Sequence, residues 1–260
     1  MGSRLIRDRS KDSRWWLMVG LFTLCVVGWS LAFSFKAGAA DTRGAPSEIV
    51  SGADQVWNLS DFNRISISGS PQVTLVQGDI ERVSANGPDK ALSRLEVFTS
   101  GGELIVRKKR GRWWNNGNTE KIELVIEFID LEQLNLSGSA EVRVEKLRSP
   151  ELNLKISGSG DTHIEQLLGD TLNLGVSGSA DINVAGTVTS QVIRISGSAD
   201  YEARDLATQA ATVRISGSGD AEIAVSSSLD ARISGSGSVR YLGDPKVQSK
   251  IFGSGDIRSL

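Results

Sequence analysis

The chain has 260 residues, of which 39% are hydrophobic and 23% charged, and this composition excludes a disordered chain and a polytopic membrane protein. A single histidine, His163, and a single cysteine, Cys25, exclude disulfide frameworks, zinc clusters and Cys–His dyads within one chain. Outside residues 1–40, 23 Lys and Arg stand against 29 Asp and Glu, so residues 41–260 have a net charge of −6 and are poorly suited to binding nucleic acid.

An uncharged stretch of 21 residues, Trp15–Phe35, is long enough to span a bilayer as a helix. The basic residues in the preceding segment, 1–14, predict a cytoplasmic tail and an exported body. Small residues around Ala39 and Ala40 fit a signal-peptidase site. Two hypotheses therefore remain open, both of which place the protein in the bacterial cell envelope. Either the segment is an inner-membrane anchor and the body lies in the periplasm, or the body is exported after cleavage near Ala39-Ala40.

The body, residues 54–260 after a linker at 36–53, is built from a repeat of about twenty residues. Seven copies of the repeat carry Ser-Gly-Ser, and Phe-Gly-Ser is a degenerate eighth copy. After the second copy the spacing is 18 to 20 residues, whereas 69 residues separate the first two. Polar and apolar residues alternate through each copy, which is typical of strands with one buried face. The copies begin at Ser68, Ser137, Ser157, Ser177, Ser196, Ser216, Ser234 and Phe252.

A single copy cannot bury its apolar face alone, so neighbouring copies must stack on one another. The sequence therefore predicts an all-β fold, a parallel β-helix (β-solenoid) with coils of about 20 residues, preceded by one N-terminal hydrophobic helix. Each coil should rise by about 4.8 Å, the usual distance between paired strands. We expect the glycine of Ser-Gly-Ser to form a narrow corner, because a residue without a Cβ atom lets successive coils approach closely.

An acidic residue follows most copies at the same spacing and predicts a column of outward carboxylates. One interpretation is that each acid accepts backbone N–H bonds at its turn, and the sequence favours it. Two others remain open: a groove for a cation or polymer, and a carboxylate pair of a polysaccharide hydrolase. Recurrence in every coil disfavours catalysis, because a catalytic pair would be unique to one coil. His163 is expected to point outward beside the column. The candidate binding residues are Asp161, Asp181, Asp200 and Asp220.

The front of the body departs from the repeat. Residues 87–95 predict a short helix, and Leu104–Val106 and Ile122–Phe128 predict strands. A loop between these strands is rich in basic residues and tryptophan. Two interpretations remain open: it contacts anionic glycans or lipid headgroups, or its tryptophans cap the open end of the solenoid. Its candidate binding residues are Arg107, Lys108, Lys109, Arg110, Arg112, Trp113 and Trp114.

Three motifs carry a resemblance to a known family. They are Phe62-x-x-Ile-x-Ile-Ser-Gly-Ser70, the stretch from Leu95 to Ile105 running on to Trp113, and Leu131-x-x-Leu-x-Leu-Ser-Gly-Ser139 with its following repeats. With these motifs the body, over about residues 54–260, resembles the head GIN domain family, described as "putative auto-transporter adhesin". The resemblance implies an exported bacterial β-helix with an adhesin-like role, and it brings no catalytic residues.

The sequence thus predicts a non-enzymatic, envelope-associated binding module. It would present repeated Ser, Asn and Asp side chains to an envelope glycan or protein partner, and membrane contact would run through residues 15–35 if they are not removed. A carbohydrate-active β-helix enzyme and a structural or sensory envelope scaffold are the alternatives. We expect no catalytic residue, no cofactor, no metal site and no nucleic-acid partner. The ligand and any association between copies of the chain are left open.

Overall fold

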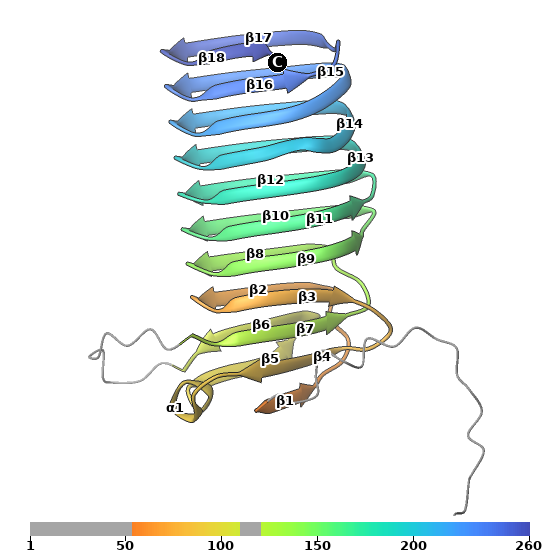
Figure 1. Cartoon of the computed structure of the whole chain (residues 1–260), viewed down its shortest axis with the longest axis vertical. Coiled ribbons are helices and arrows are strands. Elements are labelled where there is room, and N and C mark those ends of the chain that lie inside the picture. The colour runs from red at the N-terminus through yellow and green to blue at the C-terminus, as the bar shows by residue number, and fades with distance from the viewer. Residues whose placement is uncertain (1–53, 110–120) are drawn as a thin grey trace, which may run out of the picture. The chain divides into compact units, whose positions relative to one another are not determined.

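Successive copies of the repeat lie one above another as flattened coils in the computed structural model, which describes residues 54–109 and 121–260 (Figure 1). The predicted all-β fold with coils of about 20 residues is confirmed. The tail 1–14, the hydrophobic segment 15–35 and the linker 36–53 lie outside the described residues. Among the residues that are described, no helix is long and apolar enough to cross a membrane.

Each coil has two sides, which we call face A and face B. Face A holds the strands that end at the repeat glycine and the strands stacked with them: β5 (Leu95–Ser100), β6 (Glu103–Lys108), β2 (Arg64–Gly69), β8 (Gln133–Gly138), β10 (Glu151–Gly158), β12 (Thr171–Gly178) and β17 (Lys246–Gly253).

Face B holds the strands that begin with the acidic residue and the strands stacked with them. These are β1 (Gln55–Asn58), β4 (Arg82–Asn86), β7 (Glu123–Phe128), β3 (Gln72–Gln77), β9 (Glu141–Arg148), β11 (Asp161–Leu168), β16 (Ser238–Leu242) and β18 (Asp256–Ser259). Three long strands bend around the far corner and belong to both faces: β13 (Asp181–Gly197), β14 (Asp200–Gly217) and β15 (Asp220–Gly235).

Equivalent residues of successive coils pair in register. On face A, the parallel ladder places Gly138, Gly158, Gly178 and Gly197 directly above one another. Each of these glycines has a positive φ, a backbone conformation that other residues rarely adopt. The predicted narrow corner is therefore confirmed, and the shared glycine position sets one register for the whole stack.

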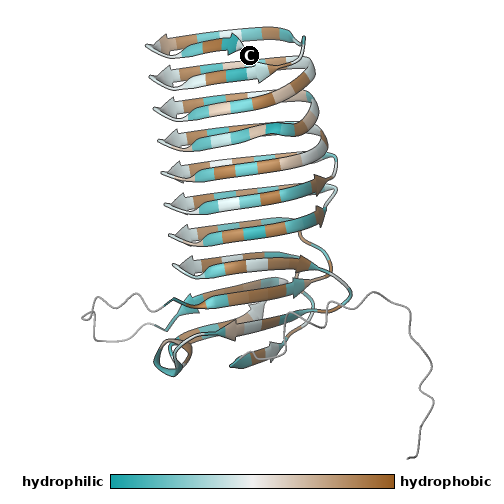
Figure 2. Ribbon diagram, in the orientation of Figure 1, coloured by the Kyte–Doolittle hydropathy of each residue, from teal (hydrophilic) through white to brown (hydrophobic). Residues whose placement is uncertain are grey.

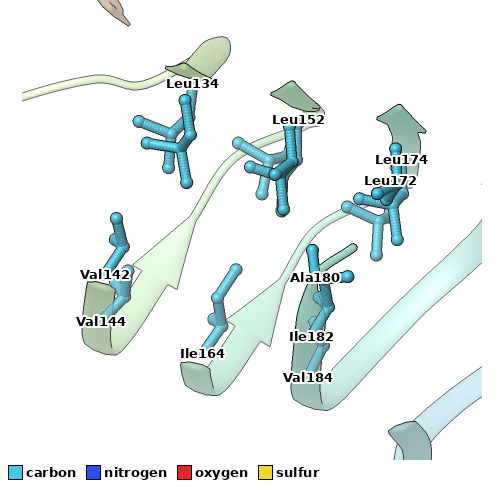
Figure 3. Packing of buried hydrophobic residues seen from close by; sticks show 14 of the residues in the cluster. Leu134, Val142, Val144, Leu152, Ile164, Leu172, Leu174, Ala180, Ile182 and Val184 are labelled. Carbon is cyan, nitrogen blue, oxygen red and sulfur yellow. The ribbon is translucent and has the colours of Figure 1, made fainter. Parts of the chain in front are cut away.

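The core lies between the two faces. Leucines of face A, such as Leu134 and Leu152, point toward Val142 and Ile164 of face B (Figure 3), and all four are almost fully buried. Figure 2 shows the alternation of apolar and polar residues along each strand that produces this core. Each such buried aliphatic side chain stabilises the fold by about 1.5–3 kcal/mol.

The 69-residue gap between the first two copies forms the N-terminal end of the stack. Strands β6 and β7 pair below β2 and β3, whereas β8 and β9 pair above them, so the first copy in the sequence is not the end coil (Figure 1). Strands β1, β4 and β5 then pair antiparallel and close this end. The expected short helix is one turn, α1 (Asp89–Leu92). The expected cap of Trp113 and Trp114 lies outside the described residues.

Candidate binding face

Acidic residues of successive coils form a column on the outside of face B. Each of them begins its strand directly after the Ser-Gly-Ser corner, so the in-register parallel pairing that aligns the glycines also aligns the acids. Their Cα atoms follow the coil rise of about 4.8 Å. We call this set, with the one serine that interrupts it, the acidic column: Glu141, Asp161, Asp181, Asp200, Asp220, Ser238 and Asp256.

Both ends of the acidic column are compensated by polar or basic side chains. Near one end, Glu141 forms an ion pair of 2.8 Å with Arg143 and accepts a 2.9 Å hydrogen bond from Gln72. These two hydrogen bonds hold the pKa of Glu141 below its usual value. Near the other end, Asp220 accepts hydrogen bonds from the backbone N–H and the hydroxyl of Ser238, at 2.8 and 2.7 Å.

The middle of the column lacks such compensation. The carboxylates of Asp161, Asp181 and Asp200 form no ion pair and accept no hydrogen bond from a side chain in the part of the chain that the structure describes. The expectation that every acid accepts a backbone N–H is therefore wrong for Asp161 and Asp181, whereas Asp200 receives a backbone hydrogen bond from Asp220. In the ladder, the N–H groups of Asp161 and Asp200 donate to the carbonyl oxygens of Ala140 and Ala180 in the coil beneath.

Repulsion within the column acts most clearly on Asp200. Partial burial raises the pKa of its carboxyl group, and the neighbouring charges of Asp220 and Asp181 raise it further. Stacked like charges one coil apart therefore disfavour ionisation at this position. The uncompensated segment is an intrinsically unfavourable arrangement for the isolated domain, and a positively charged ligand would relieve it.

A second outward column runs beside the first. It contains His163, which is exposed as expected, with Arg143 below it and Asn183 above it. Asn183 donates a 3.3 Å hydrogen bond to Glu202 on the next coil. These side chains give the face both donors and acceptors around the carboxylates.

Glu222 continues the second column but is almost buried, at 8% exposure. It forms ion pairs with Arg204 and, at 2.7 Å, with Arg240. The hydrogen bond from Arg204 is the main reason that the pKa of Glu222 lies below its usual value. Glu222 is therefore held by two arginines and is not available to a ligand.

The two columns line an open groove of about 500 Å³ that runs from Glu141 to Glu202. Asp161, Asp181 and Asp200 lie along it, and so does His163. Within residues 54–109 and 121–260, no group of three or more His, Cys, Asp or Glu side chains is arranged to hold a metal ion. The groove can instead present a row of separate carboxylates to an elongated ligand.

The basic residues predicted as a second binding surface lie elsewhere. Arg107 belongs to β6 on face A, where it pairs with Glu96 at 2.9 Å and lies over the ring of Phe98. Lys108 is exposed, and Lys109 donates a 3.1 Å hydrogen bond to the carbonyl of Ser93. The other predicted residues of this surface, Arg110, Arg112, Trp113 and Trp114, lie outside the described residues.

Sequence reasoning identified the acidic column but missed its end groups. Arg143 and Arg240 occupy the outward position two residues after the column position in their coils, where the middle coils carry His163, Asn183 and Glu202. A comparison of this position between copies would have found them, because a basic residue appears there only toward the ends of the column.

Solved bacterial proteins share this fold. A putative adhesin from Bacteroides fragilis is 24% identical with a TM-score of 0.72, and the match covers 79% of this chain and 95% of that one. A putative adhesin from Parabacteroides merdae is 20% identical with a TM-score of 0.64, and a putative lipid binding protein from Parabacteroides distasonis is 22% identical with a TM-score of 0.61, both with the same coverage.

The expected family membership is tested by comparison of the sequence with family models and with curated proteins. No curated protein matches the chain. A family model does match, over residues 61–245, which includes most of the stack and the whole of the groove. The chain belongs to the family described as "Putative auto-transporter adhesin, head GIN domain".

Proposed function

We propose that this chain is a non-enzymatic, adhesin-like module that binds an extended ligand along the acidic column. One observation carries the proposal: Asp161, Asp181 and Asp200 stack in register on an open groove without an ion pair to a described residue. Uncompensated charges of one sign along a groove attract ligand groups of the other sign. The membership of the chain in an adhesin-like family supports the same role.

The ligand in this proposal carries several positive groups along its length. Three carboxylates on consecutive coils span about 10 Å, so cationic groups about 5 Å apart, or at a multiple of that distance, match the row. Arg143 and Arg240 bound the row and would repel a cation beyond it. Amino groups of an envelope glycan and basic side chains of an envelope protein offer this chemistry.

Binding in this mode depends on repetition rather than on one strong contact. An exposed ion pair contributes about 0.2–1 kcal/mol, so a single carboxylate adds little. Several pairs formed by one ligand add up, because each further contact is intramolecular once the first has formed. A catalytic site would instead need one coil that differs from the others, and the carboxylates of the groove repeat from coil to coil.

The proposal also includes a location for the protein, in the cell envelope. An exported module of the cell envelope fits the adhesin-like family. We propose that residues 15–35 direct this export, either as a retained inner-membrane anchor or as a signal removed near Ala39-Ala40. Intact mass and fractionation of the protein expressed with its native N-terminus separate the two: full-length mass in the membrane fraction means an anchor, and a shorter soluble protein means cleavage.

A titration of the full-length chain tests the ligand class. Oligolysine and an oligomer of glucosamine with free amino groups serve as probes, and the N-acetylated oligomer serves as the uncharged counterpart. Binding of either cationic probe at low ionic strength, without binding of the acetylated oligomer, supports the proposal. Tighter binding of oligolysine indicates a protein partner, and tighter binding of the glucosamine oligomer indicates a glycan. Equal binding of the acetylated oligomer contradicts a role for charge, and turnover of any glycan overturns the non-enzymatic assignment.

Matched variants locate the surface. The triple variant D161N/D181N/D200N should weaken binding by about tenfold or more, because it removes three ion pairs. The triple variant D79N/D130N/D170N removes the same charge at exposed positions outside the groove and should bind as the wild type does. Equal losses in both variants would show that only net charge matters. Complete loss in the single variant D181N would contradict binding by repeated weak contacts.

A further inference from the structure

Strands β17 and β18 form the coil at the C-terminal end of the stack (Figure 1). Side chains of this coil are exposed, whereas their counterparts in the coil beneath are buried. Ile251 is 40% exposed, whereas Ile233, its partner in β15, is 1% exposed. Val247 is 38% exposed, whereas its partner Leu229 is 1% exposed. Among the described residues, the core of the solenoid therefore continues to this end and is left uncovered there.

The strand edges of this coil are also open. Within residues 54–109 and 121–260, β17 pairs only with β15 and β18 only with β16, so the other edge of each strand has free N–H and C=O groups. At the N-terminal end, antiparallel strands β1 and β5 change the strand direction and close the stack. A regular unpaired edge next to an exposed core is a template for pairing with another strand.

The sequence of β18 is complementary to itself. If two copies of β18 pair antiparallel about Ile257, Asp256 of each copy lies opposite Arg258 of the other, which forms two ion pairs. The two nearest alternative registers that keep the inward residues inward centre the pair on Asp256 or on Arg258, and each places two like charges opposite each other. Charge therefore selects the register about Ile257.

The sequence of β17 is complementary in the same sense. Antiparallel pairing about Ile251 places Lys250 of each copy opposite Phe252 of the other. Within one chain, the Lys250 ammonium group already lies 4.9 Å from the centre of the Phe252 ring, so a cation–π contact is available to this pair. Ile251 and Ile257 are each three residues from Ser254 in the turn, so they lie at matching positions on the two faces and one two-fold axis can pass through both centres.

We propose that the C-terminal coil binds the same coil of a second copy of this chain through that two-fold axis. Ile251 and Ile257 of the two copies then meet at the axis and join the two cores. The same surface serves both partners, so the assembly closes as a dimer and does not extend into a fibre. Because the axis runs through both faces of the coil, the two acidic columns lie on the same side of the dimer.

The oligomeric state of the full-length chain tests the proposal. Sedimentation of the wild type should show a concentration-dependent dimer. Ile251→Lys places two like charges at the axis and should raise the dimer dissociation constant by about 100-fold. Ile80→Lys, at a position that is 44% exposed and far from this coil, is the matched control and should dimerise as the wild type does. A monomeric wild type, or equal effects of both variants, would overturn the proposal.

Charge reversal distinguishes the interface from a folding defect. Asp256→Arg should weaken the dimer, because it places arginines opposite each other, and the double variant D256R/R258D should restore it. In a background with Cys25→Ser, Ile257→Cys should form a disulfide-linked dimer, and Ile80→Cys should not. A wild-type dimer that is unchanged by Asp256→Arg and not cross-linked through position 257 would assign the association to another part of the chain.

Discussion

The carbonyl oxygen of Gly138 lies directly beneath Gly158, in the space that a Cβ atom on Gly158 would need. The same relationship recurs up the stack, so each repeat glycine both turns the chain and leaves room for the coil below it. The corner thus combines two requirements, a positive φ and close backbone approach, that glycine meets at once.

Gly158→Ala should lower the free energy of unfolding by about 2–5 kcal/mol, since it adds a strained φ of +129° to a clash with backbone. Urea unfolding followed by circular dichroism measures this loss. Gly175→Ala is the matched control, because its Cβ would meet no atom within 4 Å. Equal midpoints for the two variants would contradict the close approach at the corner.

Asp200→Asn should stabilise the fold at pH 7. Burial and the charges of Asp220 and Asp181 raise the pKa of Asp200, so ionisation of this carboxyl group is less favourable in the folded state than in the unfolded state. The free energy of unfolding therefore falls as pH rises through the folded-state pKa. The gain should stay below about 1 kcal/mol, because the burial of this carboxyl group is slight and solvent screens its charge.

This gain should vanish at a pH below 3.8, the ordinary pKa of the carboxyl group, where Asp200 is neutral in both states. Urea midpoints of wild type and variant at pH 7 and pH 3 give the comparison. Asp170→Asn, outside the column, controls for the removal of one charge. A gain of the same size at both pH values would show that repulsion is not its cause.

Glu222→Gln should destabilise the fold by about 1–2 kcal/mol at pH 7, because it weakens charge-assisted hydrogen bonds to Arg204 and Arg240. The pKa of Glu222 lies below its usual value, so this stabilisation is present above pH 4.5 and is lost as pH falls through the folded-state value. The cost should therefore shrink in acid. Glu96→Gln breaks the more exposed pair with Arg107 and should cost less than about 0.5 kcal/mol.

Tyr201→Phe should cost about 1–3 kcal/mol, because it leaves a buried acceptor without its donor. The Tyr201 hydroxyl donates to Gln191 at 2.9 Å, and Gln191 donates to Thr208 at 2.9 Å inside the solenoid. Burial raises the pKa of Tyr201, so the phenol remains a donor at neutral pH. Tyr241→Phe, at a partly exposed site, should change the urea midpoint little, and equal costs would contradict the buried network.

The period-two alternation and the spacing of Ser-Gly-Ser determined the coils, the glycine corner and the acidic column. This was possible because equivalent residues of a repeat stack on one another, so their spacing along the chain is also their order in space. The alignment of Asp161 with Asp181 followed from that rule alone. The family resemblance rested on the same motifs.

Only the tertiary structure decided the two ends of the stack and the compensation of the column. Strand β6 lies below β2, whereas β8 lies above it. A chain that leaves the repeat can return on either side of a coil, and the local sequence does not encode which side it takes. The contact between Glu141 and Gln72 joins residues 69 positions apart and depends on that choice. Likewise, the N–H groups of Asp161 and Asp200 looked available in the sequence, but they donate to carbonyl oxygens of the coil beneath.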